Sequence, residues 1–249
     1  MEVEGNPRIS HEKSTRKSLN VSRLISLQNM MKRLYYYWGS TNRRKLIDRS
    51  LKKHESVFNG VVLDIGGRDR GKFKKPRDKV EKWIFADIEA SHNPDIVLDV
   101  ADMKEVENGS IDVISAMELF EHVEKIDKGL QECHRVLKKK GLMMMSIPFL
   151  YRVHADPYDF QRWTEDKWRN ELKALGFEKI RVEITGRYFT VLTEMIKTFI
   201  HVMPIGIRHF GYLFYPLFDL LSSLDRLKSV QNHSHLGKFH GGYFILCEK

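Results

Sequence analysis

Two apolar runs, each leading into an acidic residue, constrain this chain more than any other feature. Residues 61–67 read VVLDIGG, and residues 83–88 read WIFADI. Glycines after a first strand let the backbone approach a ligand, and an acid at the tip of the second strand can accept both hydroxyls of a ribose. Because Asp87 lies 21 positions after Gly66, the spacing predicts a nucleotide-type ligand at the edge of a parallel sheet. The alternative is an ordinary strand and turn that leaves Asp87 exposed.

Apolar runs alternate with helical patterns through most of the chain. We expect strands at residues 61–65, 82–87, 95–100, 111–116, 142–148, 178–184 and 242–247. A helix is expected from about 123 to 139, with Gly141 placed to end it, and another from the N-cap Thr164 to residue 175. Residues 71–82 lack a helical apolar stripe, so the first crossover helix should be short or missing. This alternation predicts an α/β fold with a parallel or mixed sheet and helices on both faces.

The length and composition fit one large domain with appendages. The chain has 249 residues, and a hydrophobic content of 42% is enough for a sizeable core. Its only cysteines, Cys133 and Cys247, lie far apart in the sequence, which fits a reduced cytoplasmic protein and excludes a disulfide scaffold. Residues 1–20 are polar and basic without an apolar core, so we expect no secretory signal.

The N-terminal 55 residues carry most of the positive charge. They hold 13 Lys/Arg against 5 Asp/Glu, which accounts for +8 of the net charge of +9. We expect this extension, residues 1–55, to be partly disordered and then helical at 21–38 and 43–54, ahead of a domain at 56–249. A basic arm attracts anionic partners such as nucleic acid or the inner face of a membrane. A solvated tail is the alternative.

An apolar insert of nearly sixty residues separates the last two expected strands. Aromatic and aliphatic residues fill positions 187–240, but Pro204 and Pro216 prevent one long helix. No apolar run of about 20 residues is present, so a spanning helix is not expected. Two or three amphipathic helices could form a lid, lie in a membrane interface, make a homodimer contact, or simply extend the core.

The ordered motifs of the chain resemble those of the class I S-adenosylmethionine-dependent methyltransferases, in particular the type 11 group. The segments that carry the resemblance are residues 61–67, Asp87 and residues 98–103, 110–114, 119–123 and 133–141. The resemblance implies a Rossmann-like sheet of seven strands, mostly parallel with the last strand antiparallel, and S-adenosyl-L-methionine as the cofactor. The chain departs from the family pattern at Arg68 and Arg70, which occupy positions where the first motif usually has glycines.

Matching the family motifs residue by residue implies a cofactor site. Its expected members are Asp64, Gly66, Gly67, Asp87, Ile88, Asp99, Asp102, Met103, Met117, Glu118 and His122. Asp99 and Asp102 are alternatives for the adenine side, because both fit with a one-residue shift. His122 is expected to cap or pack near the cofactor.

Residues 148–164 give a narrower resemblance, to methyltransferases encoded with genes for surface polysaccharides and other glycans. This implies a glycan acceptor, which could be lipid-linked. His154 is the candidate general base, because histidine titrates near neutral pH and this one follows the fifth strand. Asp156 and Asp159 could orient it or bind sugar hydroxyls, and Arg162 could bind an acidic sugar or phosphate. Tyr158 and Trp163 could stack on a sugar, or could belong to the core.

Other readings stay open at this point. The acceptor could be RNA or a small molecule, although the chain shows no module that joins stacking aromatics to basic residues, so a nucleic acid is not the expected partner. A noncatalytic scaffold with the same fold is a further alternative. His154, Asp156 and Asp159 are loosely spaced on a loop, so we expect no metal site. The expected location is cytoplasmic, with peripheral contact to the inner face of a membrane.

Overall fold

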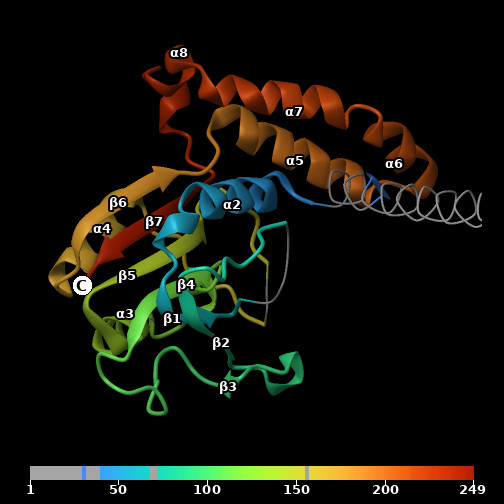
Figure 1. The fold of residues 1–249 in the computed structure, drawn as a ribbon. Coiled ribbons are helices and arrows are strands. Elements are labelled where there is room, and N and C mark those ends of the chain that lie inside the picture. Colours follow the sequence, from blue (N-terminus) through green and yellow to red (C-terminus); the bar gives the residue numbers. More distant parts are fainter. Residues whose placement is uncertain (1–29, 32–39, 68–71, 155–156) are drawn as a thin grey trace, which may run out of the picture. The chain divides into compact units, whose positions relative to one another are not determined.

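The computed structural model describes residues 30–31, 40–67, 72–154 and 157–249 (Figure 1). Contacts divide the chain into two compact units, Met1–Ser40 and Thr41–Lys249. The helix expected at 21–38 therefore lies almost entirely outside the described residues. The helix expected at 43–54 is present as α2 (Asn42–Lys53), and it belongs to the second unit rather than to a separate extension.

A seven-stranded sheet forms the centre of the second unit and confirms the expected fold class. Its strands are β1 (Gly60–Ile65), β2 (Val80–Asp87), β3 (Ile96–Val97), β4 (Ile111–Met117), β5 (Leu137–Pro148), β6 (Glu178–Ile184) and β7 (Gly242–Glu248). They are ordered β3-β2-β1-β4-β5-β7-β6. The first five in this order run parallel, and β7 is antiparallel to both β5 and β6.

The expected boundary between the helix at 123–139 and the fifth strand was wrong, and so was the expected length of the third strand. Helix α3 (Ile126–Val136) ends before Gly141, and β5 begins at Leu137. The pairing of β4 with β5 shifts between Ile111 and Val113, so residues 138–141 bulge out of the ladder instead of ending a helix. Strand β3 has two residues rather than six, because the chain turns where the backbone N–H of Asp102 donates to the carbonyl oxygen of Asp99.

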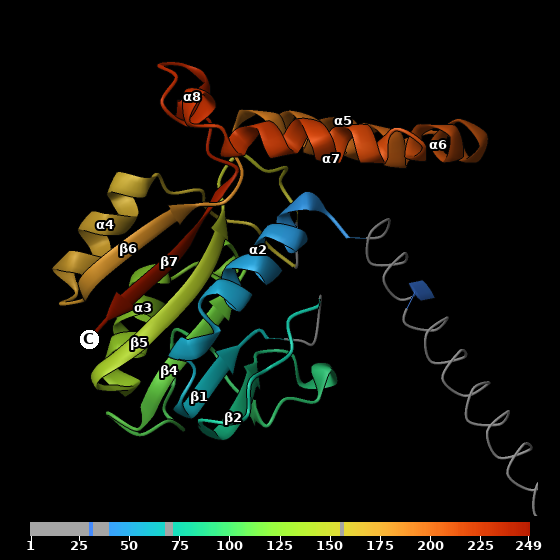
Figure 2. The same ribbon diagram turned by 45° about the horizontal axis from the view of Figure 1, so that its top comes forward.

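The two faces of the sheet bury different helices (Figure 2). On one face, α3 and α4 (Glu165–Ala174) pack on a large core with Leu130 and Trp168 at its centre. On the other face, α2 covers the sheet with Ile47 and Leu51 in a smaller core. The described residues 72–79, between β1 and β2, contain no helix, as expected. Helix α2 thus covers a sheet face from a position upstream of the first strand.

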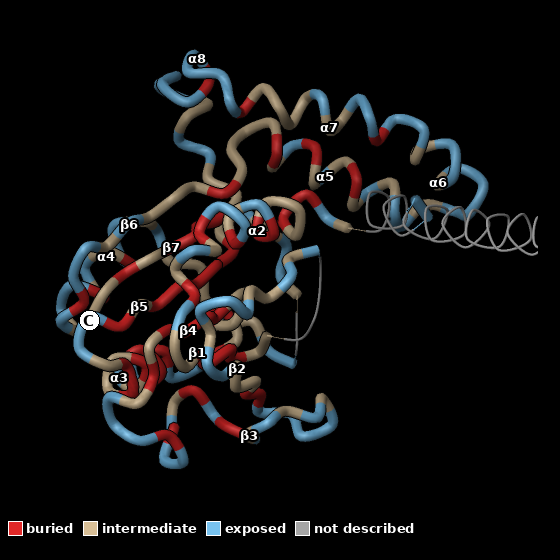
Figure 3. Tube along the Cα trace, in the orientation of Figure 1, coloured by how far each residue is buried: buried red, intermediate tan, exposed pale blue. Residues whose placement is uncertain are grey.

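Alternation along the strands explains how one sheet serves two cores. Met143 and Met145 on β5 belong to the larger core, while Met144 between them belongs to the smaller one. All three are fully buried, as are most of the residues in the middle of the sheet (Figure 3). Strand β5 is therefore covered on both faces along residues 142–148, which fits the nearly continuous apolar sequence of this part of the strand.

The insert is helical and extends away from the sheet (Figures 1 and 2). It consists of α5 (Tyr188–Val202), α6 (Ile205–Tyr212), α7 (Tyr215–Ser223) and α8 (Lys228–Gln231). A polar cluster joins its base to α2: the Lys197 ammonium donates to the Asn42 side chain at 2.7 Å, and the Asn42 backbone N–H donates to Glu194 at 3.0 Å. Within the described part of the chain, no helix combines the length and hydropathy needed to cross a bilayer.

Candidate active site

A cavity of about 1450 Å³ lies beyond the carboxyl ends of β1, β2 and β4. This is the edge at which parallel α/β sheets hold their ligands. Ten of the residues expected in the site line the cavity: Asp64, Gly66, Gly67, Asp87, Ile88, Asp99, Met117, Glu118, His122 and Tyr158. Residues that the sequence predicted for one site, from position 64 to position 158, therefore meet at one edge of the sheet.

The glycine pair makes room at the start of the cavity. Gly66 has a φ of +68°, a backbone conformation that favours glycine. A side chain at Gly67 would place its Cβ 2.1 Å from the Asp64 carboxylate. Asp64 is itself buried and lies 3.0 Å from the Lys75 ammonium. Gly66 thus permits the turn after β1, and Gly67 leaves room for the Asp64 carboxylate. The two arginines of the expected departure, at 68 and 70, lie outside the described residues.

Asp87 occupies the end of β2, where the sequence placed a ribose-binding acid. The side chain is largely buried, and Oδ1 accepts the backbone N–H of Glu89 at 3.0 Å. Oδ2 lies 3.0 Å from Nδ1 of His92. These contacts hold the carboxylate at the rim of the cavity.

The alternatives for the adenine side are separated by the structure. Asp99 lines the cavity, and its Oδ1 accepts the backbone N–H of Ala101 at 2.8 Å. Asp102 does not line it; its carboxylate lies 2.6 Å from the exposed Lys104 ammonium. Met103 is fully buried in the larger core and does not line the cavity either. The turn between Asp99 and Asp102 directs the two acids to different places.

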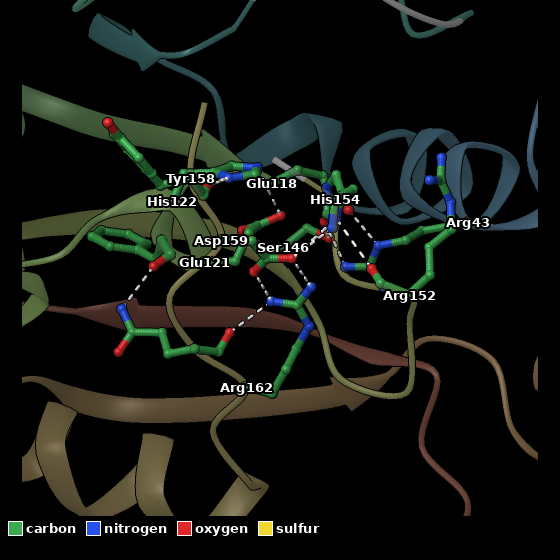
Figure 4. A network of polar contacts seen from close by, with 12 residues as sticks. Arg43, Glu118, Glu121, His122, Ser146, Arg152, His154, Tyr158, Asp159 and Arg162 are labelled. Atoms are coloured by element: carbon green, nitrogen blue, oxygen red, sulfur yellow. Dashed lines mark hydrogen bonds and ion pairs between the residues drawn. The ribbon is translucent and has the colours of Figure 1, made fainter. Parts of the chain in front are cut away.

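Glu118 follows β4 and lines the cavity in a left-handed backbone conformation, with a φ of +55°. Nη2 of Arg43 donates to Oε1 of its carboxylate at 2.5 Å, Nε of Arg43 donates to Oε2, and the Ser146 hydroxyl donates to Oε1 at 2.8 Å (Figure 4). Burial by itself would raise the pKa of Glu118, but these partners, Arg43 above all, hold it below its usual value. A strained backbone held by three side-chain contacts is typical of functional sites.

Glu121 follows one turn later and has a very different environment. It is 0% exposed, and neither carboxylate oxygen has a hydrogen-bond partner among the described residues. Burial, and then the charge of Glu118, raise the pKa of Glu121 to about 8. Nε2 of His122 is 3.8 Å from Oε1 of Glu121. The pKa of Glu118 is thus lowered while that of its neighbour Glu121 is raised. Opposite pKa shifts of this kind are common in catalytic sites.

The loop after β5 places His154 next to His122. The His154 and His122 rings meet edge to face with their centroids 5.1 Å apart. Burial, and then His122, lower the pKa of His154. The backbone N–H of His154 donates to the Asp159 carboxylate at 3.0 Å, and Asp159 accepts two hydrogen bonds from the Arg162 guanidinium.

Three residues of this loop that were expected to bind the acceptor, Asp159, Arg162 and Trp163, contact other side chains of the protein. Asp159 is nearly buried, and its pairing with Arg162 braces the loop; neither side chain lines the cavity. Trp163 packs against Trp168 with ring centroids 4.7 Å apart, so it belongs to the core. Asp156 lies outside the described residues. His154 does not line the cavity, but it touches His122, which does.

Three further residues of this site received no role from the sequence. Glu121 follows the fourth strand, but its sequence position does not distinguish it from Glu118. Ser146 is an inward-facing residue of β5, with no local mark of function. Arg43 lies 75 positions before its partner Glu118, so only the folded chain reveals the contact.

Comparison with known proteins agrees with this fold. Residues 77–145 match a family model described as a methyltransferase domain. A structure of a SAM-dependent methyltransferase from Archaeoglobus fulgidus has 16% identity over 83% of this chain and 94% of that chain, with a TM-score of 0.50. The cyclase SpnF has 15% identity over 81% of this chain and 80% of that chain, with a TM-score of 0.51.

These similarities show the fold, and one fold hosts more than one reaction. A search of curated protein sequences found no match. The domain match, the strand order and the cavity together support S-adenosylmethionine as the cofactor.

Proposed function

We propose that this protein is an S-adenosylmethionine-dependent methyltransferase that methylates a hydroxyl group of a glycan, most simply a lipid-linked sugar. One observation carries the proposal. One cavity is lined both by a first group, the glycine pair, Asp87 and Asp99, and by a second group, Glu118 and His122. A cofactor held by the first group would direct its reactive end toward the second.

The residues of the first group fit the cofactor's chemistry. Asp87 presents a carboxylate where a ribose diol would need an acceptor, and Gly66 and Gly67 leave space for the methionine part. When bound, S-adenosylmethionine supplies an electrophilic methyl group on a positively charged sulfur. The chain itself must align the acceptor oxygen with that methyl group and exclude water.

The side chains clustered around His122 support a hydroxyl acceptor. A hydroxyl oxygen must lose its proton to become a competent nucleophile, whereas a carboxylate has none to lose. Glu121, His122 and His154 gather proton-accepting and cation-binding atoms directly beside the cavity. This collection of groups is more than an already ionised acceptor would need.

The insert supports a lipid-linked acceptor. Large apolar side chains are exposed along its helices: Leu192, Met195, Phe199, Val202, Ile205, Ile207, Phe210, Leu213, Phe214, Leu217 and Leu220. Exposed apolar surface of this extent usually meets another apolar surface. Helix α5 is also tied through Asn42 to α2, so this surface is anchored to the unit that holds the cavity.

Transfer of a radiolabelled methyl group tests the proposal. The full chain is incubated with S-adenosylmethionine labelled on the methyl group and with glycolipids extracted from cells that carry its gene. We expect label in the organic phase, released as a methylated sugar on mild acid hydrolysis, and none with Asp87→Ala. Label in added RNA instead, or in aqueous small molecules alone, would overturn the proposed acceptor.

A further inference from the structure

Glu121, His122 and His154 form a cluster with more ligating atoms than removal of one proton requires. Glu121 and His122 come from the short 3-10 helix Phe120–His122 after β4, and His154 comes from the loop after β5. One carboxylate oxygen of Glu121 and one ring nitrogen of each histidine lie within 4.8 Å of one another. The segments that follow β4 and β5 therefore place three possible metal-ligating atoms close together.

Glu121 is the most unusual member of the cluster. Its carboxyl group is fully buried and accepts no hydrogen bond from any described residue. The nearest cationic side chains are engaged elsewhere, because Arg43 pairs with Glu118 and Arg162 pairs with Asp159. Such a carboxyl group is costly to ionise, and buried ionised groups in proteins are paired or bind metal ions. The Glu121 carboxyl group thus has no hydrogen bond to a positively charged side chain among the described residues, although a cation could bind there.

Both histidines are held by their Nδ1 atoms. Nδ1 of His122 lies 2.5 Å from the carbonyl oxygen of Tyr158. Nδ1 of His154 lies 3.3 Å from the carbonyl oxygen of Arg152 and 3.4 Å from the Asp159 carboxylate. An Nδ1–H that donates to a carbonyl or carboxylate fixes the ring and leaves the Nε2 lone pair available. This support by neighbouring acceptors is the usual setting of histidines that bind metals.

We propose that Glu121, His122 and His154 bind one divalent metal ion beside the cofactor cavity. Two imidazole nitrogens and one carboxylate oxygen suit divalent transition ions such as Mn²⁺, Fe²⁺ or Zn²⁺ and leave further coordination positions open. Ligands held at about 2.1 Å from one ion are at most about 4.2 Å apart, so the three side chains close in slightly on binding. His122 lines the cavity, which gives the ion a path to a bound acceptor.

The ion's role in catalysis rests on the proposed function. The ion holds the acceptor hydroxyl and favours loss of its proton to solvent. The oxygen then forms the new bond to the methyl carbon as the carbon–sulfur bond breaks, and that bond's electron pair stays on the sulfur. Binding of the ion does not depend on this role and can be measured without cofactor or acceptor.

Electron paramagnetic resonance of Mn²⁺ tests the site directly. The full chain, without a histidine tag and stripped with a chelator, is titrated with Mn²⁺, and free Mn²⁺ is read from its six-line spectrum. We expect one bound ion per chain, displaced by Zn²⁺, and an affinity at least tenfold weaker in both Glu121→Gln and His154→Asn. Glu121→Gln preserves the shape of a buried side chain, and His154 is only partly buried, so at least one variant should fold normally.

Two matched variants guard against binding elsewhere. Glu105→Gln removes an exposed acid, and His235→Asn disturbs the exposed pair His233 and His235, whose rings are 6.1 Å apart. Both should bind Mn²⁺ like the unaltered chain. Absence of binding by the unaltered chain, or binding lost in His235→Asn but kept in the cluster variants, would overturn the proposal. Calorimetry with S-adenosylmethionine on the same samples separates this failure from failure of the proposed function.

Discussion

Arg43 on α2 forms a two-point ion pair with Glu118 at the end of β4, across 75 positions of sequence. Both side chains are largely buried. A helix that precedes the first strand therefore contributes a charged group to the edge of the sheet where the cavity lies. The pair joins the cover of the sheet to the candidate site.

Removing Arg43 should destabilise the fold strongly. Among the described residues, Arg43→Met leaves the buried Glu118 carboxylate with only the Ser146 hydroxyl as a side-chain donor, and breaking such a pair costs about 3–5 kcal/mol. Denaturant unfolding measures this free energy. Lys52→Met is the matched control, because the Lys52–Glu55 pair is exposed and should be worth less than about 1 kcal/mol. Equal losses in the two variants would contradict the role assigned to Arg43.

Two glycines should respond to alanine in opposite ways. A Cβ at Gly242 would lie 2.1 Å from Nη1 of Arg43 and 2.5 Å from the carbonyl oxygen of Ile147, so Gly242→Ala should cost about 1–3 kcal/mol. A Cβ at Gly206 in α6 meets nothing within 4 Å, so Gly206→Ala should leave the stability unchanged or raise it slightly. Thermal unfolding compares them. A Gly242→Ala protein as stable as the unaltered chain would show that both the Arg43 side chain and the backbone at Ile147 can move aside freely.

Asp225 should control the base of the insert. Its carboxylate accepts the backbone N–H groups of Arg187, Phe189 and Thr190 at 2.8–3.0 Å, so it caps α5 from a distant part of the chain. Asp225→Ala should speed hydrogen exchange at these amides at least tenfold, because their acceptor is lost. Exchange in β4 should stay unchanged. Uniform acceleration throughout the protein would indicate global destabilisation instead.

The exposed apolar side chains of the insert should bind lipid. The double variant Phe199→Ser and Phe210→Ser removes two large side chains, each 62% exposed. Flotation with anionic vesicles should recover the unaltered protein in the lipid fraction and much less of the variant. Phe239→Ser, which removes an exposed phenylalanine outside these helices, is the control and should float normally. Failure of the unaltered chain to float would remove the lipid-linked acceptor's main support.

Local signals predicted most of the sheet and several helix ends. Strand β6 was expected at 178–184 and is found there, and Thr164 caps α4 by accepting the backbone N–H of Lys167. These features depend on residue patterns that lie within a few positions of one another. The glycine pair and Asp87 reach one cavity for the same reason, because parallel strands end at the same edge of a sheet.

Features that depend on distant partners could not be predicted in this way. The partner of Arg43 lies in another strand, and the burial of Glu121 depends on packing around the loop after β5. The bulge at residues 138–141 follows from the register of β4 against β5, and apolar patterning does not reveal register shifts of this kind. From the sequence alone, Trp163 could pack in the core or stack on a sugar. Its contact with Trp168 in the folded chain favours the core.

Calorimetric titration with S-adenosylmethionine tests the account most directly. The unaltered chain should bind one equivalent with micromolar affinity, and Asp87→Ala should bind at least tenfold more weakly, a loss of about 1.4 kcal/mol or more. Asp102→Ala should bind like the unaltered chain, because Asp102 lies outside the cavity. Absence of binding by the folded, unaltered chain, or equal binding by Asp87→Ala, would contradict the proposed cofactor site.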